Sequence, residues 1–305
     1  MNPIMKIDGS ALLLSFGLCL FPALAGETAD QNDLAAFLAN RGSVIIPYTL
    51  DSGGGMIVDA VLCPTVQKCV GTPFGFDSGD PDNNIGRELT DKLALTGKEK
   101  VLDRLYLGGL PPISYFPIYF SEQTLRGSYL GAHWMEKLGL WLDFGAREVY
   151  GSVPPGAVED YMKGSALKYR TFALKSFETY RYITVSINGK EQVNFLVDTG
   201  TTGSVIDKNY AQSLGLRFSD KQCTTLGSQI GETRTCFTHD IVSMKAGNQP
   251  LSVYLPRGFA DLDTSFIVPP LNIKGIVGME WLERNAVIMS LAENKLYVPV
   301  MEGAT

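Results

Sequence analysis

The chain has 305 residues, a net charge of -6, 45% hydrophobic residues and 19% charged residues. This length allows one large domain or two of about 140 residues each, and the composition excludes a disordered protein. The acidic balance and the lack of a Lys or Arg run argue against a nucleic-acid partner, because binding phosphates requires a basic face.

The first 25 residues have the pattern of a secretory signal peptide. Lys6 precedes an apolar run over residues 11–21, and Ala23 and Ala25 supply small residues for cleavage. The apolar run is shorter than the roughly 20 residues of a transmembrane helix. We therefore expect a periplasmic or secreted protein with no stable membrane span in the mature chain. An uncleaved membrane anchor is the alternative.

Four cysteines remain after residues 1–25: Cys63, Cys69, Cys223 and Cys236. An even number of cysteines in an exported chain predicts two disulfides, although four cysteines permit three pairings. The simplest pairing joins Cys63 to Cys69 and Cys223 to Cys236. A zinc site is the alternative, but the spacing matches no zinc pattern, and we expect neither a metal nor a cofactor.

Most of the remaining chain consists of short strand patterns separated by Gly and Pro turns, which is typical of an all-β protein. Residues 26–43 are expected to form an N-terminal extension with a short helix. Two β lobes follow at residues 44–151 and 171–300. A linker at residues 152–170 contains Pro154, Pro155 and Gly156. Residues 301–305 are a tail.

The first lobe contains two Asp-Ser-Gly tripeptides, one beginning at Asp51 and one at Asp77. Strand patterns at residues 45–50 and 56–62 flank Asp51, so we interpret it as part of a hairpin turn. Asp77 follows an apolar segment and precedes a helix-like stretch that ends at Leu95. We assign the functional role to Asp77 and keep Asp51 as the alternative.

The second lobe begins with a predicted β-hairpin. Alternating residues at 182–187 and a second run at 193–197 flank Asn188 and Gly189, a strong hairpin signal. The second strand leads directly into Asp198, Thr199 and Gly200.

The two lobes repeat one another. GAHWMEKLGLWLDFGAREVYG from Gly131 aligns without a gap with GMEWLERNAVIMSLAENKLYV from Gly278. A second gapless overlay places Asp77 on Asp198. Such self-similarity indicates a duplication that includes the acidic residue.

A pair of aspartates can hydrolyse a peptide without a metal. One carboxylate takes a proton from water while the other protonates the leaving amine, because like charges about 3 Å apart cannot both ionise. Glycine allows the tight turn, and a Ser or Thr hydroxyl can form hydrogen bonds to the other lobe. Only His133 and His239 are available for a histidine-assisted nucleophile, and no Gly-x-Ser-x-Gly motif occurs.

The segment FLVDTGTTGSVID, with Ile276, Val277 and Gly278 further on, resembles the retropepsin and pepsin clan of aspartic peptidases. The chain looks most like exported bacterial proteins with two fused retropepsin-like lobes. This resemblance implies an all-β, pseudo-twofold bilobal domain with Asp198 and Asp77 as the catalytic pair. It also implies active-site loops, bracing glycines and cross-lobe bonds made by Thr199 and Ser78. The loop residues are Thr199, Gly200, Thr201, Ser78 and Gly79, and the bracing residues are Gly278 and Gly131.

Members of this clan also carry a flap, a hairpin that closes over the substrate. The residues that suit this role are Gly227, Ile230 and Gly231, between Cys223 and Cys236. In the first lobe, too few residues separate Leu95 from Asp103 for a flap.

The leading hypothesis is an aspartic endopeptidase that cleaves polypeptides as a monomeric pseudodimer. One alternative is a homodimer that uses only Asp198 of each chain. Another is a pseudopeptidase that binds a peptide between the lobes. Asp80 favours the latter, because the resembling family has Ala, Ser or Thr at that position.

Overall fold

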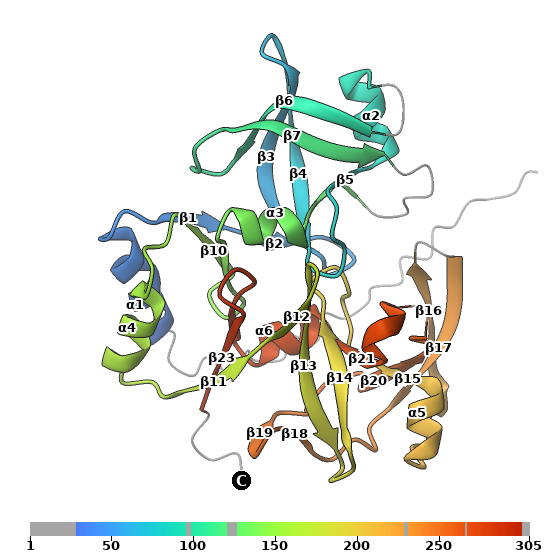
Figure 1. Cartoon of the computed structure of the whole chain (residues 1–305). Helices are drawn as coiled ribbons and strands as arrows, with labels where there is room; N and C mark the ends of the chain where they lie inside the picture. The colour runs from blue at the N-terminus through green and yellow to red at the C-terminus, as the bar shows by residue number, and fades with distance from the viewer. Residues whose placement is uncertain (1–28, 96–98, 121–126, 229–230, 266, 301–305) are drawn as a thin grey trace, which may run out of the picture.

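The computed structural model describes residues 29–95, 99–120, 127–228, 231–265 and 267–300. The predicted signal peptide and the tail at 301–305 lie outside the described residues. Strands dominate the fold, and they form two lobes that lie one above the other in Figure 1. The predicted all-β class with two similar lobes is confirmed.

Among the described residues, the first-lobe sheet has the strand order β2-β3-β4-β8-β5-β7-β6, and an additional pairing of β3 with β6 closes it. Residues of β3 alternate between buried and exposed, which directs Met56, Val58, Ala60 and Leu62 inward. The elements of this lobe are β2 (Thr49–Leu50), β3 (Met56–Thr65), β4 (Lys68–Asp77), β5 (Asn84–Ile85), α2 (Arg87–Leu93), β6 (Glu99–Leu107), β7 (Ile113–Phe120), β8 (Tyr129–Gly131) and α3 (Ala132–Lys137).

The second-lobe sheet has the order β16-β17-β20-β15-β21-β14-β13-β18-β19 within the described part of the chain, with β12 paired to β13. Its elements are β12 (Lys175–Phe177), β13 (Tyr180–Ile187), β14 (Gln192–Val197), β15 (Val205–Asp207), α5 (Lys208–Ser213), β16 (Ser219–Ser228), β17 (Gly231–Thr238), β18 (Met244–Ala246), β19 (Gln249–Leu251), β20 (Phe259–Leu262), η1 (Pro269–Leu271), β21 (Ile273–Val277) and α6 (Met279–Arg284).

A third sheet, the interlobe sheet, joins the lobes in the order β1-β10-β9-β22-β23-β11. Leu142 of the first lobe pairs with Met289 of the second. Its strands are β1 (Val44–Pro47), β9 (Trp141–Asp143), β10 (Glu148–Gly151), β11 (Tyr169–Ala173), β22 (Ile288–Ser290) and β23 (Lys295–Pro299). One chain therefore builds a continuous sheet from both halves of the duplication.

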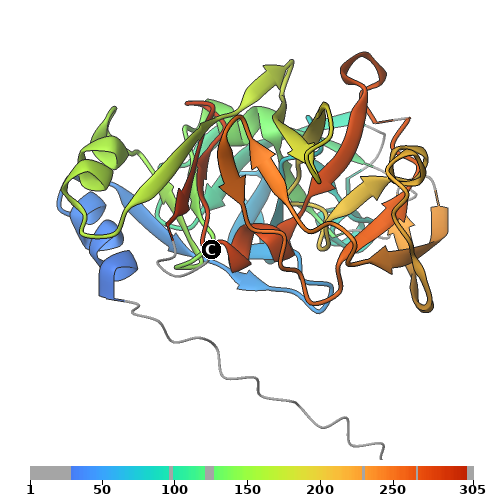
Figure 2. The same cartoon turned by 90° about the horizontal axis from the view of Figure 1, so that it is seen from below.

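Two helices pack on the interlobe sheet: α1 (Ala29–Ala39) and α4 (Ala157–Gly164). They lie side by side at the left of Figure 2. Leu34, Leu38 and Val158 are fully buried in one apolar cluster with Trp141 and Tyr297 of the sheet. The stretch predicted as a linker thus contains a helix, because its apolar residues find a partner in the N-terminal extension.

The helices and strands of the two lobes correspond to each other, as the duplication in the sequence predicts. The helices α3 and α6 each follow a strand that runs beside one of the two aspartate-bearing strands, and each leads into a strand of the interlobe sheet. The strand β7 runs parallel to β5 as β20 runs parallel to β15. Within the described residues of the first lobe, no strand corresponds to β16, which extends the second-lobe sheet beyond β17.

Both predicted disulfides are present, Cys63 with Cys69 in the β3–β4 hairpin and Cys223 with Cys236 in the β16–β17 hairpin. No helix in the described part of the chain is long and apolar enough to cross a membrane.

Candidate active site

The fold places Asp77 and Asp198 at equivalent ends of two strands. Asp77 is the last residue of β4, which runs parallel to β8. Asp198 follows β14, which runs parallel to β21. Both residues are buried, with 3% and 7% of their surfaces exposed.

The two loops approach each other so closely that each aspartate faces a glycine of the other lobe. A Cβ atom on Gly200 would overlap the carboxyl group of Asp77, and one on Gly79 would overlap that of Asp198. The structure therefore brings the two predicted loops together, and a larger residue at either glycine position would displace the facing carboxyl group.

Four hydrogen bonds join the loops across the lobes. The amide of Ser78 donates to Oγ1 of Thr199 at 2.9 Å, and the amide of Thr199 donates to Oγ of Ser78 at 3.0 Å. The hydroxyls in turn donate to carbonyl oxygens of the opposite lobe, Thr199 to Phe76 and Ser78 to Val197, each at 3.0 Å. Both side chains are buried, so each hydroxyl serves as donor and acceptor at once.

The two carboxylates have different surroundings. Asp198 accepts hydrogen bonds from the amide of Gly200 at 2.7 Å and from the hydroxyl of Thr201 at 2.6 Å. On the other side, the amide of Gly79 donates a hydrogen bond to Asp77 at 3.0 Å. In the duplicated register, Asp80 occupies the position of Thr201.

Asp80 is engaged by its own lobe. Its carboxylate accepts hydrogen bonds from the amide of Asp82 at 3.0 Å and the hydroxyl of Tyr129 at 2.7 Å. Both oxygens of Asp80 accept bonds within its own lobe, whereas the hydroxyl of Thr201 donates to Asp198, so the two residues serve different roles in their loops.

Gly131 and Gly278 lie against the backs of the loops. A Cβ atom on Gly278 would overlap the carbonyl oxygens of Thr201 and Gly203, and one on Gly131 would overlap that of Asp82. The amide of Gly131 donates to Asn83 Oδ1 at 2.9 Å. A larger residue at either position would displace the backbone of the neighbouring loop.

Asp51 lies in an exposed turn between β2 and β3. Its carboxylate accepts hydrogen bonds from the amides of Gly53 and Gly55 at 2.8 and 2.9 Å, which satisfies the turn that contains it. The carbonyl oxygen of Gly53 accepts a bond from the hydroxyl of Thr202 at 2.6 Å. The tripeptide at Asp51 is therefore a hairpin turn that rests on the second lobe.

The predicted flap corresponds to the β16–β17 hairpin at the right of the second lobe in Figure 1. Gly227 pairs with Glu232, and Ser228 pairs with Gly231. Ile230 lies outside the described residues. The disulfide between Cys223 and Cys236 joins the two strands below these pairs.

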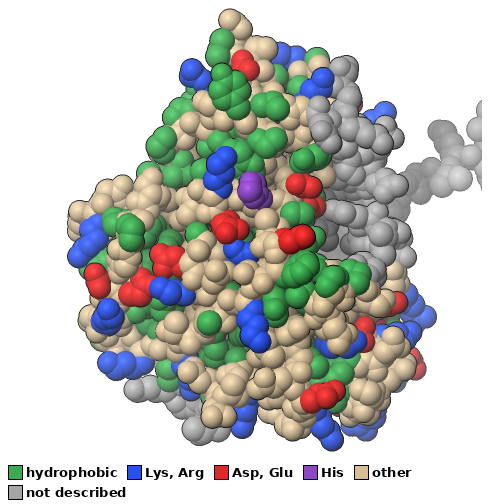
Figure 3. Space-filling model, viewed as in Figure 1, with side chains coloured by type: hydrophobic (Ala, Val, Ile, Leu, Met, Phe, Trp, Pro, Cys, Tyr) green, Lys and Arg blue, Asp and Glu red, His purple; other side chains and the backbone are tan. Residues whose placement is uncertain are grey.

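Tyr180, at the start of β13, is a residue of this site that the sequence analysis missed. Burial raises the pKa of its hydroxyl, and the carboxylates of Asp80, Glu178, Asp82 and Asp77 raise it further. The pKa of Tyr180 therefore depends on carboxylates of the first lobe although Tyr180 belongs to the second. Figure 3 shows acidic and apolar side chains together where the lobes meet. No motif in the sequence marks a lone tyrosine at a strand start.

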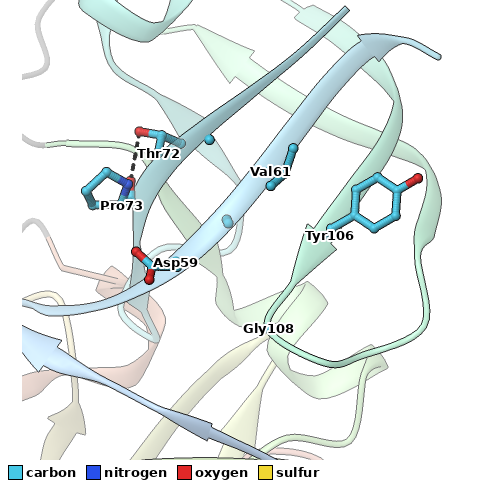
Figure 4. A pocket seen from close by; sticks show the side chains of 8 residues that line it. Asp59, Val61, Thr72, Pro73, Tyr106 and Gly108 are labelled. Carbon is cyan, nitrogen blue, oxygen red and sulfur yellow. Dashed lines mark hydrogen bonds between the residues drawn. The ribbon is translucent and has the colours of Figure 1, made fainter. Parts of the chain in front are cut away.

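A separate hollow of about 470 Å³ lies on the first lobe, between strands β3, β4 and β6. Figure 4 shows Asp59, Pro73 and Tyr106 around it. Neither aspartate loop lines this hollow, so the candidate active site rests on the loops themselves.

Comparisons with known proteins agree with this geometry. A family model described as aspartyl protease matches residues 183–281 of the second lobe. No curated protein matches the chain. An aspartic proteinase from Irpex lacteus is similar in structure, with a TM-score of 0.53 and 14% identity over 86% of this chain and 98% of that one.

Two basic 7S globulins are similar at lower TM-scores. Basic 7S globulin from soybean has a TM-score of 0.47 and 9% identity, over 84% of this chain and 94% of that one. Conglutin gamma from lupine seeds has a TM-score of 0.49 and 11% identity, over 85% of this chain and 95% of that one. The likeness to the Irpex lacteus proteinase shows the two-lobed fold of pepsin-like aspartic peptidases, and the aspartyl protease family model covers part of the second lobe.

Proposed function

We propose that this protein is an aspartic endopeptidase that hydrolyses peptide bonds with a water activated between Asp77 and Asp198. The observation that carries the proposal is the reciprocal bonding of Ser78 and Thr199, which holds the two aspartate loops against each other. This contact supports a pair because it holds two aspartates of separate lobes close to each other.

In this mechanism the pair shares one proton. The ionised carboxylate removes a proton from the water molecule, and the oxygen of that water attacks the scissile carbonyl carbon. The protonated carboxyl group donates its proton to the leaving nitrogen. The amides of Gly79 and Gly200 each hold one carboxylate oxygen, which limits rotation of the two side chains. The two carboxyl groups titrate as a unit in such a pair.

The proposal assigns both carboxylates to one chain. The interlobe sheet pairs β9 with β22 within a single molecule, so the second half of the duplication takes the place of a second subunit. We propose a monomeric pseudodimer that acts on polypeptides, with the β16–β17 hairpin as its single flap.

The proposed location is the periplasm or the exterior of the cell. Disulfides persist in oxidising compartments, and the two disulfides here are compatible with either location. The predicted signal peptide supports the same proposal from the sequence.

The test uses an unstructured polypeptide as substrate at mildly acidic pH. Asp198→Asn and Asp77→Asn should each reduce kcat by roughly a hundredfold to ten-thousandfold, because each removes one half of the acid–base pair. Asp51→Asn is the matched control and should retain activity, since its carboxylate holds only its own turn. Full activity in Asp77→Asn would refute the intrachain pair, and loss of activity on dilution with a dimeric mass would support the homodimer.

The second candidate function is a pseudopeptidase that binds peptides without cleaving them. Asp80, in place of the hydroxyl residue Thr201 of the other lobe, is the observation that favours it. Stable capture of a peptide with no turnover across a broad pH range would support this function. Cleavage gained by Asp80→Thr would then identify Asp80 as the residue that silences the site.

A further inference from the structure

Arg181 is a buried cation at the junction of the two lobes, with 2% of its side chain exposed. Its guanidinium donates to the carbonyl oxygens of Leu291 at 3.1 Å, Thr179 at 3.0 Å and Glu178 at 3.3 Å. Its Nη2 lies 2.8 Å from Oε2 of Glu136 in the first lobe. A buried charge requires such a partner, because removal from water is costly.

Glu136 belongs to the element that supports the Asp77 loop. It lies on α3, and the first two amides of α3 donate to that loop, Ala132 to the carbonyl of Asp80 at 2.7 Å and His133 to that of Pro81 at 3.3 Å. Asp80 in turn donates its amide to the carbonyl of Asp77 at 3.4 Å. A displacement of Glu136 would therefore be transmitted to Asp77 through one short helix.

Arg181 belongs to the element that supports Asp198. The next residue, Tyr182, pairs with Leu196 in the β13–β14 hairpin, and β14 runs directly into Asp198. The same guanidinium holds the turn at Glu178 and Thr179. That turn leads directly into Tyr180, whose pKa is raised by carboxylates of the first lobe.

We infer that Arg181 and Glu136 are a positioning pair that sets the separation and orientation of the Asp77 and Asp198 carboxylates. The ion pair joins the helix behind one aspartate to the hairpin that carries the other. This inference rests on the proposed function, and it adds two residues that touch neither carboxylate. The Ser78–Thr199 contact joins the loop tips, whereas Arg181 and Glu136 join the elements beneath them.

The duplication supplies a matched comparison. Glu283 occupies the position of Glu136 on α6, and it also bonds across the lobes, to Arg147 at 3.0 Å and to the hydroxyl of Tyr48 at 3.3 Å. Arg147 is 53% exposed and precedes β10 of the interlobe sheet. Neither Arg147 nor Tyr48 lies in the β3–β4 hairpin that leads to Asp77, so this second pair attaches the lobes without joining the two aspartate supports.

The experiment compares Glu136→Ala and Glu136→Gln with Glu283→Ala, and Glu88→Gln controls for loss of an exposed carboxylate. Glu136 is the residue changed, because its side chain is 40% exposed and its loss does not open a buried cavity. Two readouts are needed: kcat and KM on an unstructured polypeptide, and hydrogen–deuterium exchange of residues 77–80 and 178–182.

We expect Glu136→Ala to lower kcat by about tenfold to a hundredfold with little change in KM, because misplaced catalytic groups slow the chemical step. Exchange should accelerate in both segments. Glu136→Gln retains a hydrogen-bond acceptor and should lie between the wild type and Glu136→Ala. In Glu283→Ala and Glu88→Gln, we expect kcat and the exchange rates of both segments to equal those of the wild type.

Unchanged exchange in Glu136→Ala, or an equal loss of kcat in Glu283→Ala, would overturn the inference. A wild-type protein that cleaves no polypeptide would instead refute the proposed function, and the exchange comparison would still decide whether the pair couples the two supports.

Discussion

Ser78 and Thr199 exchange hydrogen bonds across the two lobes, amide to hydroxyl in both directions, at 2.9 and 3.0 Å. Each hydroxyl also donates to a carbonyl of the opposite lobe, so neither loop satisfies its buried polar groups alone. The bonds between the two aspartate loops therefore join the lobes and shape the candidate active site, and a change in these bonds should alter both stability and activity.

Thr199→Val tests this link. Valine has nearly the shape of threonine but leaves the amide of Ser78 and the carbonyl of Phe76 without their partner. An unsatisfied buried polar group costs about 1–3 kcal/mol, so we expect the free energy of unfolding to fall by about 2 kcal/mol or more, together with kcat. Thr202→Val, which removes one exposed bond to Gly53, is the control. Denaturant unfolding and peptide cleavage measure the two effects, and a stable, fully active Thr199→Val would contradict the prediction.

The second prediction concerns the pKa of Tyr180, which nearby carboxylates raise. Burial is the largest cause that raises the pKa of Tyr180, and Asp80 is the next. Asp80→Asn removes the charge but keeps an oxygen that can accept from Tyr129, so the pKa of Tyr180 should fall while remaining above its ordinary value. Ultraviolet titration of Asp80→Asn, with and without Tyr180→Phe, isolates this hydroxyl. An unchanged titration would show that Asp80 does not act on Tyr180.

Asp143 should make the stability of the fold depend on pH. This residue is fully buried in the interlobe sheet, and burial raises its pKa to about 6 from 3.8, with a smaller contribution from Glu148. Bonds from Tyr150 and from the amides of Gly145 and Ala146 oppose the shift. Because the folded pKa lies above the unfolded one, the folded chain binds the proton more tightly. Stability should therefore fall as the pH rises from about 4 to about 6, by at most about 3 kcal/mol.

Asp143→Asn should abolish this dependence, since the amide stays neutral at every pH. Its oxygen can accept from Gly145 and Ala146, and its nitrogen can donate to Tyr150, whose hydroxyl then donates to Glu148. Thermal unfolding at pH 4, 5 and 7 measures the difference, with the exposed Asp160→Asn as control. Parallel pH curves for wild type and Asp143→Asn would rule out Asp143 as the source.

The two disulfides provide a test of the proposed flap. Replacement of Cys223 and Cys236 by serine should weaken the β16–β17 hairpin and raise KM, if this hairpin closes over the substrate. Closing a loop of this size contributes up to about 3 kcal/mol, so the free energy of unfolding should fall as well. Replacement of Cys63 and Cys69 by serine is the control. That disulfide lies in the β3–β4 hairpin, at the end of the first lobe that points away from the second lobe (Figure 1). A rise in KM for both pairs would count against a specific flap.

Several elements follow from local pattern. The β13–β14 hairpin has period-two alternation around Asn188 and Gly189, and the structure pairs Ser186 with Gln192 beside that turn. The two disulfides join cysteines only 6 and 13 residues apart, so proximity in the chain was enough to pair them. The gapless repeat likewise placed α3 and α6 in equivalent positions.

Contacts between distant residues could not be predicted in this way. Nothing in the spacing of Glu136 and Arg181 indicates an ion pair, because charged residues that far apart in a sequence are usually solvated separately. The residues of helix α4 follow Pro154, Pro155 and Gly156, a pattern that predicts a linker and not a helix. The N-terminal helix α1 packs with α4 in one apolar cluster.

By itself, the sequence determined the duplication, the two aspartate loops and the strands that deliver them, because each depends on residues close together in the chain. Only the tertiary structure decided that Asp77, and not Asp51, lies against the Asp198 loop, and which side chains support that contact. The physical reason is that the interlobe sheet sets how the lobes meet. Its strands come from both lobes and are far apart in the chain, so their pairing cannot be predicted from local sequence pattern.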